Sequence, residues 1–267
     1  MRFPDLHGKA AIVSGGATGI GRAVMEALGA QGVRVTFSDM SEDGSQTEAA
    51  CAKRGLQVQF VRGDMADEAF CSRLAQAARE RWGQVDILVN NAFSFCTKGL
   101  DAARADWLRV MSVGPLAFAK MAQEVAPSMK EQGGGAIVNL SSISAHIAQP
   151  NRWTYNSAKG AVNQLTRCMA MDLAPYNIRV NTVSPGWIWT REVEKAAIGG
   201  REKWEPVWGK FHMLRRLGRV EEAAAPVVFL CSSAAGFITA AELTVDGGYL
   251  GMGPEGLGEN SSFAGSD

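Results

Sequence analysis

A tyrosine and a lysine stand four residues apart in the segment YNSAK, at positions 155 and 159. Four residues make about one turn of an α-helix, so on a helix Tyr155 and Lys159 lie on the same face. A free tyrosine has a pKa of about 10, so about one molecule in a thousand is ionised at pH 7. A neighbouring ammonium favours the phenolate. The pair is therefore a candidate acid/base that takes a proton from a hydroxyl or returns one to a ketone.

Ser142 is the candidate third member of this site. It lies in NLSSISA, directly after the apolar segment of a predicted strand. Its hydroxyl could hold the substrate oxygen while Tyr155 moves the proton. A plainer interpretation also exists, because tyrosine–lysine pairs at this spacing are common on solvated helix faces and serines often end strands. The catalytic interpretation therefore depends on a cofactor motif elsewhere in the chain.

A glycine-rich loop, SGGATGIG at residues 14–21, follows the first predicted strand and precedes a predicted helix. Gly15, Gly19 and Gly21 permit a tight turn and a close approach of the backbone to a ligand. The N–H groups and partial positive charge of a helix N-terminus suit a pyrophosphate. The spacing differs from G-x-G-x-x-G, and a turn without a ligand is the alternative. However, strand, loop and helix occur in the order that a dinucleotide site requires.

Asp39 ends the second predicted strand, 18 residues after Gly21. A carboxylate at this place accepts hydrogen bonds from the adenosine ribose and repels the 2′-phosphate of NADP. Residues 14–21 and 40–42 contain no arginine or lysine that would bind this phosphate. The alternative is a turn aspartate without a ligand. The position of Asp39 favours NAD as the cofactor.

The composition excludes several classes of function. Lysines plus arginines and aspartates plus glutamates number 27 each in 267 residues, so no basic field is available for nucleic acid or an anionic membrane. The five scattered cysteines include no CxxC pair, which indicates a reducing, cytoplasmic location without disulfides or a metal site. The N-terminus lacks an apolar h-region, and no apolar run is long enough to span a bilayer. We therefore expect a small-molecule substrate.

Short apolar segments alternate with segments of helical periodicity. Their order predicts a parallel sheet with helices on both faces. The predicted strands are 10–14, 33–38, 56–61, 85–90, 135–141, 178–184 and 242–247, and the predicted helices are 19–31, 43–54, 67–82, 102–131, 153–174 and 221–231. The segment 187–219 interrupts the alternation and contains four of the seven tryptophans, which is typical of a lid or binding loop. The Gly- and Ser-rich tail 251–267 has a composition typical of disorder.

Several motifs occur together in one order and spacing. Besides the glycine loop and YNSAK, the chain contains GDM at 63–65, NNA at 90–92, a serine thirteen residues before Tyr155, RVNTVSPGWIWT at 179–190 and DGG at 246–248. Over roughly residues 5 to 250 the sequence resembles the short-chain dehydrogenase/reductase family. The resemblance implies a single Rossmann-like doubly wound α/β domain with a seven-stranded parallel sheet over residues 1–250. It also implies a homotetramer.

The resemblance also implies roles for individual residues. Ser142 orients the substrate, Tyr155 is the acid/base, and Lys159 binds the nicotinamide ribose and lowers the pKa of the tyrosine. Asp64 and Met65 are expected at the adenine. The full set of implied cofactor-binding residues is Gly15, Thr18, Gly19, Ile20, Gly21, Asp39, Asp64, Met65, Asn91, Tyr155, Lys159, Ile188 and Thr190.

The sequence departs from the family pattern at three positions. Phe93 follows NNA where the family usually has a glycine, and Ala240 stands where a glycine usually follows a threonine. Gly114 occupies the place of the usual catalytic asparagine. The effect of Gly114 on a fourth catalytic role is left open by the sequence.

Pro115 follows Gly114 in the predicted helix 102–131. Because Pro115 has no N–H, the carbonyl of Met111 loses its helical partner, and the glycine tolerates the non-helical angles that precede a proline. We expect a kink here. We further expect the freed backbone to bind a water that continues a proton relay from Lys159. A kink caused by packing alone is the alternative.

The expected substrate pocket mixes polar side chains with flat aromatic walls. Such a pocket favours a sugar, a polyol or another polar secondary alcohol over a long acyl chain, and an aromatic alcohol is an alternative. The residues expected near Ser142 and Tyr155 are Ser144, His146, Gln149, Asn151, Arg152, Trp153 and Trp187.

The sequence thus predicts an NAD-dependent oxidoreductase that interconverts a secondary alcohol and a ketone. A 3-oxoacyl-carrier-protein reductase is one alternative, but it requires NADP, which Asp39 opposes. A dinucleotide-binding sensor or scaffold without turnover is another, motivated by Phe93 and Gly114. The presence of Ser142 together with Tyr155 and Lys159 argues against it.

Overall fold

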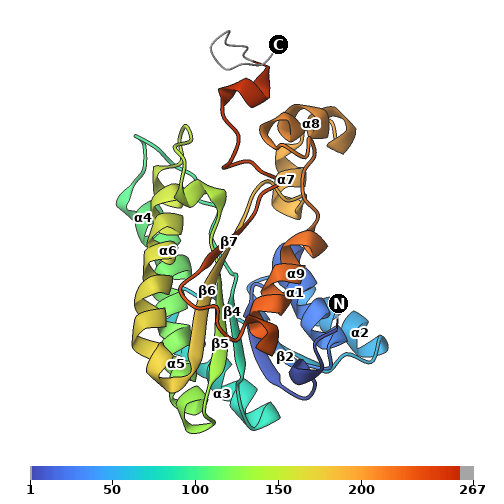
Figure 1. The fold of residues 1–267 in the computed structure, drawn as a ribbon, viewed down its shortest axis with the longest axis vertical. Coiled ribbons are helices and arrows are strands. Elements are labelled where there is room, and N and C mark those ends of the chain that lie inside the picture. The colour runs from blue at the N-terminus through green and yellow to red at the C-terminus, as the bar shows by residue number, and fades with distance from the viewer. Residues whose placement is uncertain (1, 259–267) are drawn as a thin grey trace.

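Seven parallel strands form one sheet in the order β3-β2-β1-β4-β5-β6-β7 in the computed structural model, which describes residues 2–258 (Figure 1). This confirms the predicted doubly wound α/β fold. The strands are β1 Ala10–Ser14, β2 Arg34–Asp39, β3 Val58–Arg62, β4 Ile87–Asn90, β5 Gly135–Leu140, β6 Ile178–Pro185 and β7 Glu242–Val245. The helices are α1 Gly19–Ala30, α2 Asp43–Lys53, α3 Glu68–Trp82, α4 Arg104–Met111, α5 Ala117–Glu131, α6 Trp153–Leu173, α7 Arg191–Ala196, α8 Arg201–Trp208 and α9 Val220–Cys231.

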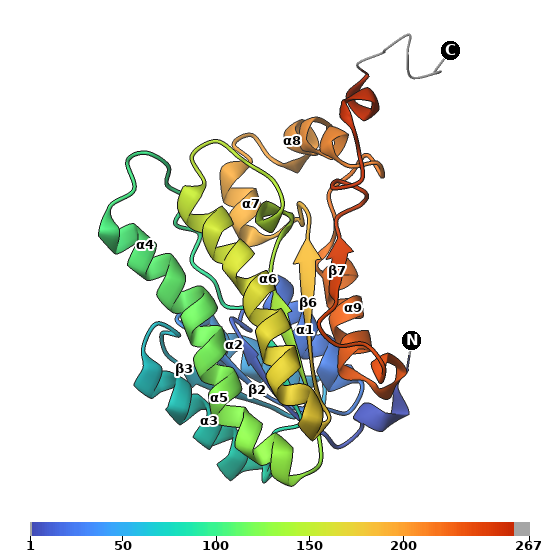
Figure 2. The ribbon, with the colours of Figure 1, turned by 60° about the vertical axis from the view of Figure 1, so that its left-hand side comes forward.

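Helices cover both faces of the sheet (Figures 1 and 2). Helices α1 and α9 pack together on one face, and α3, α5 and α6 cover the other. The strands explain this arrangement, because successive residues of a strand point to opposite faces. Val13 packs under α1, whereas its neighbour Ile12 packs under α3 and α5. Each central strand is therefore apolar on both faces, as a parallel sheet between two helix layers requires.

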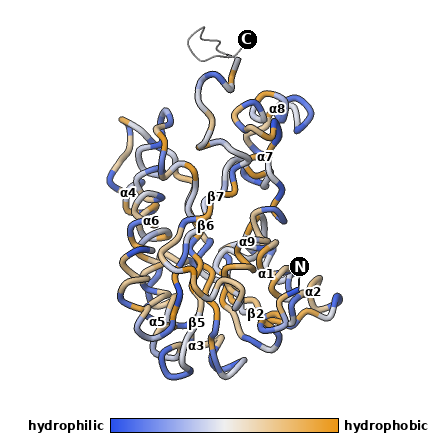
Figure 3. Tube along the Cα trace, viewed as in Figure 1, coloured by the Kyte–Doolittle hydropathy of each residue, from blue (hydrophilic) through white to orange (hydrophobic). Residues whose placement is uncertain are grey.

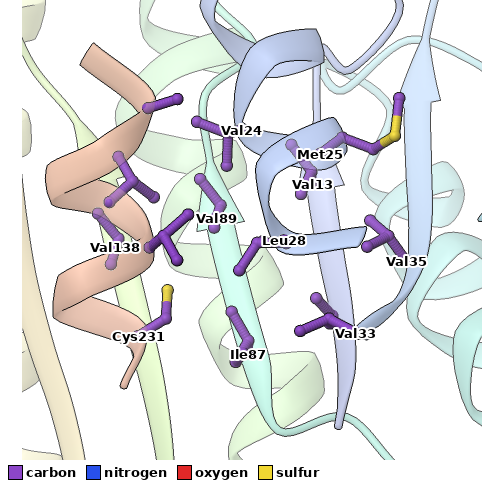
Figure 4. Packing of buried hydrophobic residues seen from close by; sticks show 14 of the residues in the cluster. Val13, Val24, Met25, Leu28, Val33, Val35, Ile87, Val89, Val138 and Cys231 are labelled. Atoms are coloured by element: carbon purple, nitrogen blue, oxygen red, sulfur yellow. The ribbon is translucent and has the colours of Figure 1, made fainter. Parts of the chain in front are cut away.

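The hydrophobic residues follow this layered plan. The strands form an apolar band through the centre of the molecule, and the outer helix faces mix polar and apolar residues (Figure 3). On the α1 side, Val24 and Leu28 of the helix lie over Val13 and Ile87 of the sheet, and Cys231 of α9 extends the same layer (Figure 4). This packing fixes the start of α1 relative to the ends of β1 and β4.

The predicted helix 102–131 is two helices joined by a kink. Between α4 and α5 the chain forms a π-helical turn, and Gly114 has non-helical backbone angles, φ −89° and ψ −109°. The missing N–H of Pro115 and its steric effect on the residue before it account for this break. The predicted kink is confirmed.

The segment 187–219 contains α7 and α8, which lie beyond the carboxyl ends of the strands in the upper part of Figure 1. The tail reaches a short 3-10 turn at Pro254–Leu257, and the rest of the predicted tail, from residue 259, lies outside the described residues. Among residues 2–258 no helix is long and apolar enough to cross a membrane.

Candidate active site

A cavity of about 710 Å³ crosses the carboxyl ends of the strands. The strand order reverses between β1 and β4, and ligands of doubly wound sheets bind in the crevice outside this reversal. Gly15 and Gly19 line one part of the cavity, and Ser142, Tyr155 and Lys159 line another. The topology therefore brings the glycine loop and the candidate acid/base into one site.

The glycine loop has the shape that a pyrophosphate needs. Helix α1 begins at Gly19, and Thr18 provides no side-chain cap for its first N–H groups. Gly19 has a φ of +58°, and a Cβ there would meet only the Thr190 side chain, at an ordinary contact distance of 3.8 Å. By contrast, a Cβ on Gly21 would overlap the carbonyl oxygen of Gly15. Gly19 therefore leaves room for a ligand beside the loop, and Gly21 allows α1 to pack against the turn.

Backbone hydrogen bonds fix the polar residues beside this loop. The Asp39 carboxylate accepts from Ala17 N at 3.2 Å and from Ser41 N at 3.0 Å, which holds it at the cavity wall. The Asn91 side chain donates to the carbonyls of Ser14 and Gly15, both at 3.0 Å. Asn91 thus braces the loop from the end of β4.

Asp64 and Met65, which the resemblance assigns to the adenine, line the same cavity. The Asp64 carboxylate pairs with Arg109 at 2.5 Å. Desolvation raises the pKa of Asp64, but the hydrogen bonds from Arg109 and from Ala66 N outweigh it and lower the pKa. Arg109 was not predicted from the sequence. The two residues are 45 positions apart, and no local pattern links them.

Three elements converge on the candidate acid/base. Ser142 lies just beyond β5, and its Oγ accepts from Ser144 N at 3.1 Å, which leaves its own hydrogen free to donate. Tyr155 and Lys159 lie one turn apart on α6, as predicted, and both are buried. Lys159 Nζ donates to the carbonyl of Leu140 at 2.9 Å, so α6 is tied to the end of β5.

Burial has the largest effect on the pKa values of Tyr155 and Lys159. It raises the pKa of Tyr155 to about 12, opposed by the hydrogen bond from Ser142 and by the charge of Arg152. Burial also lowers the pKa of Lys159 to about 7. Ser142 and Arg152 are the groups that lower the pKa of Tyr155 here, and a lowering by Lys159 stays a prediction. A neutral Tyr155 hydroxyl is the form that can protonate a ketone oxygen.

Comparison with known proteins identifies the family. A family described as enoyl-(acyl carrier protein) reductase matches residues 15–250. A cis-4-hydroxycyclohexanecarboxylate dehydrogenase of Sinomonas cyclohexanicum is 35% identical over 254 residues, covering 91% of this chain and 97% of that protein. The chain is a short-chain dehydrogenase/reductase.

Two solved members of this family have the same fold. A 7α-hydroxysteroid dehydrogenase in complex with NADH and 7-oxo glycochenodeoxycholic acid superposes with a TM-score of 0.86, at 34% identity, covering 92% of this chain and 96% of the other. A ligand-free aldohexose dehydrogenase of Thermoplasma acidophilum also has a TM-score of 0.86, at 30% identity, covering 94% and 98%.

In this short-chain dehydrogenase/reductase the aromatic ring of Phe93 packs against Lys159. Lys159 Nζ lies 3.6 Å from the centre of the Phe93 ring, which also meets the Tyr155 ring edge-on at 5.3 Å. A Cβ on Gly114 would lie only 2.5 Å from Cε2 of the same ring. Phe93 and Gly114 therefore fit each other. The ring lies between Lys159 and the kink, so the predicted water relay from the lysine to that backbone is not supported.

The substrate end of the cavity contains only part of the predicted set. Ser144, Gln149, Arg152 and Trp187 line it together with Ser142 and Tyr155. Its lining in the described chain does not include His146, Asn151 or Trp153. His146 Nε2 instead lies 2.6 Å from the Glu242 carboxylate of β7, and Trp153 is 53% exposed. A position close in sequence to Tyr155 therefore does not ensure a position in the pocket, because the loop before α6 turns some side chains outward.

The segment 187–219 supplies one wall of the cavity. The Trp187 and Trp208 rings lie 5.2 Å apart, and both line the cavity. Ile188 and Thr190 also line it, and the Thr190 hydroxyl caps α7 by accepting from Val193 N at 3.4 Å. Trp208 was not predicted from the sequence to line the cavity. No group of metal-ligating side chains suited to a metal ion occurs among residues 2–258.

Proposed function

We propose that the protein is an NAD-dependent oxidoreductase that interconverts a secondary alcohol and a ketone by hydride transfer. One observation carries the proposal: Ser142, Tyr155 and Lys159 open into the cavity that the glycine loop and Asp39 also line. A proton donor and acceptor thus lies beside a site suited to a dinucleotide. A sensor without turnover has no need of all three side chains.

Residues of this chain fit NAD. The uncapped start of α1 would bind the pyrophosphate, and Asp39 would accept hydrogen bonds from the adenosine ribose. We assign Asp64 and Met65 to the adenine, Asn91 to bracing the loop near the adenosine ribose, and Ile188 and Thr190 to the carboxamide. The NADH in the 7α-hydroxysteroid dehydrogenase complex supports the choice of cofactor. When bound, the oxidised cofactor supplies the hydride acceptor and a positive charge that favours the phenolate.

The chain's own residues handle the proton and the substrate oxygen. Ser142, fixed by Ser144 N, donates a hydrogen bond to that oxygen. Tyr155 removes the hydroxyl proton during oxidation and returns it during reduction. Lys159, held by Leu140, binds the nicotinamide ribose and favours the phenolate when it is protonated.

For the substrate we propose a polar secondary alcohol such as a sugar or polyol. The cavity combines Gln149 and Arg152 with the flat rings of Trp187 and Trp208, which suits a polar molecule with one apolar face. The aldohexose dehydrogenase among the similar structures supports this class. We also propose a homotetramer in the cytoplasm, which sedimentation analysis and cell fractionation would test.

Formation of NADH with a panel of sugars, polyols and aryl alcohols tests the activity, and Tyr155→Phe tests the assigned acid/base. This substitution deletes only the phenolic oxygen, so turnover should fall by more than 100-fold while the Kd for NADH changes little. Ser142→Ala should lower kcat with a similarly small effect on NADH. Activity of Tyr155→Phe within tenfold of the wild type would contradict the assignment.

An acyl-carrier-protein reductase is the second candidate, favoured by the description of the matched family. It is expected to use NADP, which the carboxylate of Asp39 opposes. Assays with 3-oxoacyl and enoyl thioesters and NADPH separate the two candidates. Faster turnover of these thioesters than of any alcohol with NAD would favour the second.

A further inference from the structure

Arg152 is a cation at the substrate end of the cavity, and no partner for it occurs among residues 2–258. It lies just before α6, one helical turn before Tyr155, and lines the cavity. Its guanidinium forms no ion pair and no hydrogen bond within residues 2–258. An arginine presents five N–H donors in a planar fork that matches a carboxylate. These donors are therefore available to a ligand.

The other arginines of the cavity wall are already paired. Arg109 binds Asp64 at 2.5 Å, and Arg191 binds Asp43 at 2.7 Å. Arg109 and Arg191 belong to the part of the cavity that the cofactor-binding residues line. Arg152 belongs to the part that Ser142 and Tyr155 line. Positive charge without a partner is thus concentrated at the substrate end.

The electrostatic field of Arg152 reaches this end of the site. Its charge lowers the pKa of Tyr155 and of Tyr249, although burial has the larger, opposite effect on each. The arginine follows Asn151, which has a φ of +58°. This left-handed conformation is one that asparagine tolerates, and it makes the sharp turn from which α6 and Arg152 begin. The backbone therefore fixes where the charge enters the cavity.

Aromatic rings line the same cavity as Arg152. Phe95 stacks on Tyr155 with ring centres 5.4 Å apart, and Trp187 and Trp208 form the wall contributed by the segment 187–219. A cavity that combines aromatic rings with a free guanidinium suits a compact molecule that has an apolar body and one anionic end. Because the charge of Arg152 acts on Tyr155, an anionic group bound to the guanidinium would lie on the same side of the cavity as the reacting carbon.

We propose that Arg152 is a substrate-binding residue and that the substrate is a hydroxy acid or its oxo acid. The carboxylate binds the guanidinium, and the secondary alcohol carbon lies at Ser142 and Tyr155. The inference rests on the proposed function and narrows its polar alcohol to an anionic one, which includes sugar acids. The 4-hydroxycyclohexanecarboxylate named for one relative belongs to this class.

Matched pairs of substrates test the proposal in the full-length enzyme. Each hydroxy acid, such as cis-4-hydroxycyclohexanecarboxylate or an aldonic acid, is assayed with NAD beside its methyl ester or amide. We expect the wild type to prefer the acid by at least tenfold in kcat/KM. Arg152→Leu should lower kcat/KM for the acid by about 100-fold and for the neutral partner by less than threefold, and Arg152→Lys should recover part of the loss.

Arg191→Met is the matched control, because it removes a cavity cation that already has a partner. It should leave the acid-to-ester ratio unchanged. Equal use of acids and esters by the wild type, or equal losses for both in Arg152→Leu, would overturn the role of Arg152 and leave the proposed oxidoreductase in place. A preference for phosphorylated alcohols over carboxylates would overturn the hydroxy-acid class.

Binding of benzoate in the presence of NADH tests the anion site at Arg152 if no alcohol of the panel is turned over. Weaker benzoate binding to Arg152→Leu and to Arg152→Gln than to the wild type would support the anion site even if the proposed reaction is wrong. Equal binding to all three proteins would overturn it. Unchanged NADH affinity and circular dichroism show that each variant is folded.

Discussion

Replacing the buried lysine of the candidate active site should make the protein without cofactor more stable at pH 7, and the lowered pKa of the lysine should make this gain disappear as the pH rises toward 10. Burial lowers the pKa of Lys159 from 10.5 to about 7. Each pH unit between the native and unfolded pKa corresponds to about 1.4 kcal/mol, so a lysine that is charged in the unfolded chain costs the native state about 4 kcal/mol at pH 7. Between pH 7 and 10.5 the native state binds fewer protons than the unfolded chain, so stability rises with pH. By pH 10 the cost falls to about 1 kcal/mol.

Lys159→Met removes this titration and keeps a long side chain. The loss of the hydrogen bond to the Leu140 carbonyl and of the contact with the Phe93 ring lowers the stability of the variant by a constant amount, about 1–3 kcal/mol for the unpaired carbonyl. The pH dependence is therefore the sharper measure. From pH 7 to 10 the wild type should gain about 3 kcal/mol relative to Lys159→Met.

Urea unfolding followed by tryptophan fluorescence, without NAD, gives both stability curves. Tyr155 is present in both proteins, and its raised pKa destabilises the native state only above pH 10, so its contribution cancels between pH 7 and 10. Lys159→Met should also lose turnover. Parallel stability curves, with a difference that varies by less than 1 kcal/mol from pH 7 to 10, would refute the argument that the lysine is buried with little compensation.

Three further substitutions test the site and its frame. The wild type should prefer NAD over NADP by at least tenfold in kcat/KM, and Asp39→Ser, which removes the carboxylate expected at the adenosine ribose, should reduce this preference. Equal use of NAD and NADP by the wild type would contradict the assignment of Asp39. Gly114→Ala places a Cβ 2.5 Å from the Phe93 ring, which should cost about 1–3 kcal/mol of unfolding free energy, and Phe93→Ala in the same chain should relieve most of it. Ala240→Gly should raise the unfolding free energy by about 1 kcal/mol, because Ala240 has a left-handed φ of +58°; unchanged thermal unfolding would argue against that strain.

The sequence by itself determined the fold and predicted the candidate acid/base residues. Alternating apolar strands and amphipathic helices predict the parallel sheet, since each segment must bury its apolar faces between two layers. Tyr155 and Lys159 could be recognised because their relation is local: four residues on one helix always share a face. The kink at Gly114 and Pro115 was predictable for the same reason, because proline acts on its own turn and on the residue before it.

The tertiary structure decided which distant residues share the site. Arg109 meets Asp64, and the Phe93 ring fills the space beside Gly114, across separations in sequence that no local pattern spans. The Phe93 ring, from the loop after β4, lies between Lys159 and the kink, so the structure does not support the water relay expected from the sequence. The orientation of the loop before α6 likewise places Arg152 in the cavity and turns His146 toward Glu242. Side-chain direction in a loop depends on packing against the rest of the fold, and only the folded chain shows it.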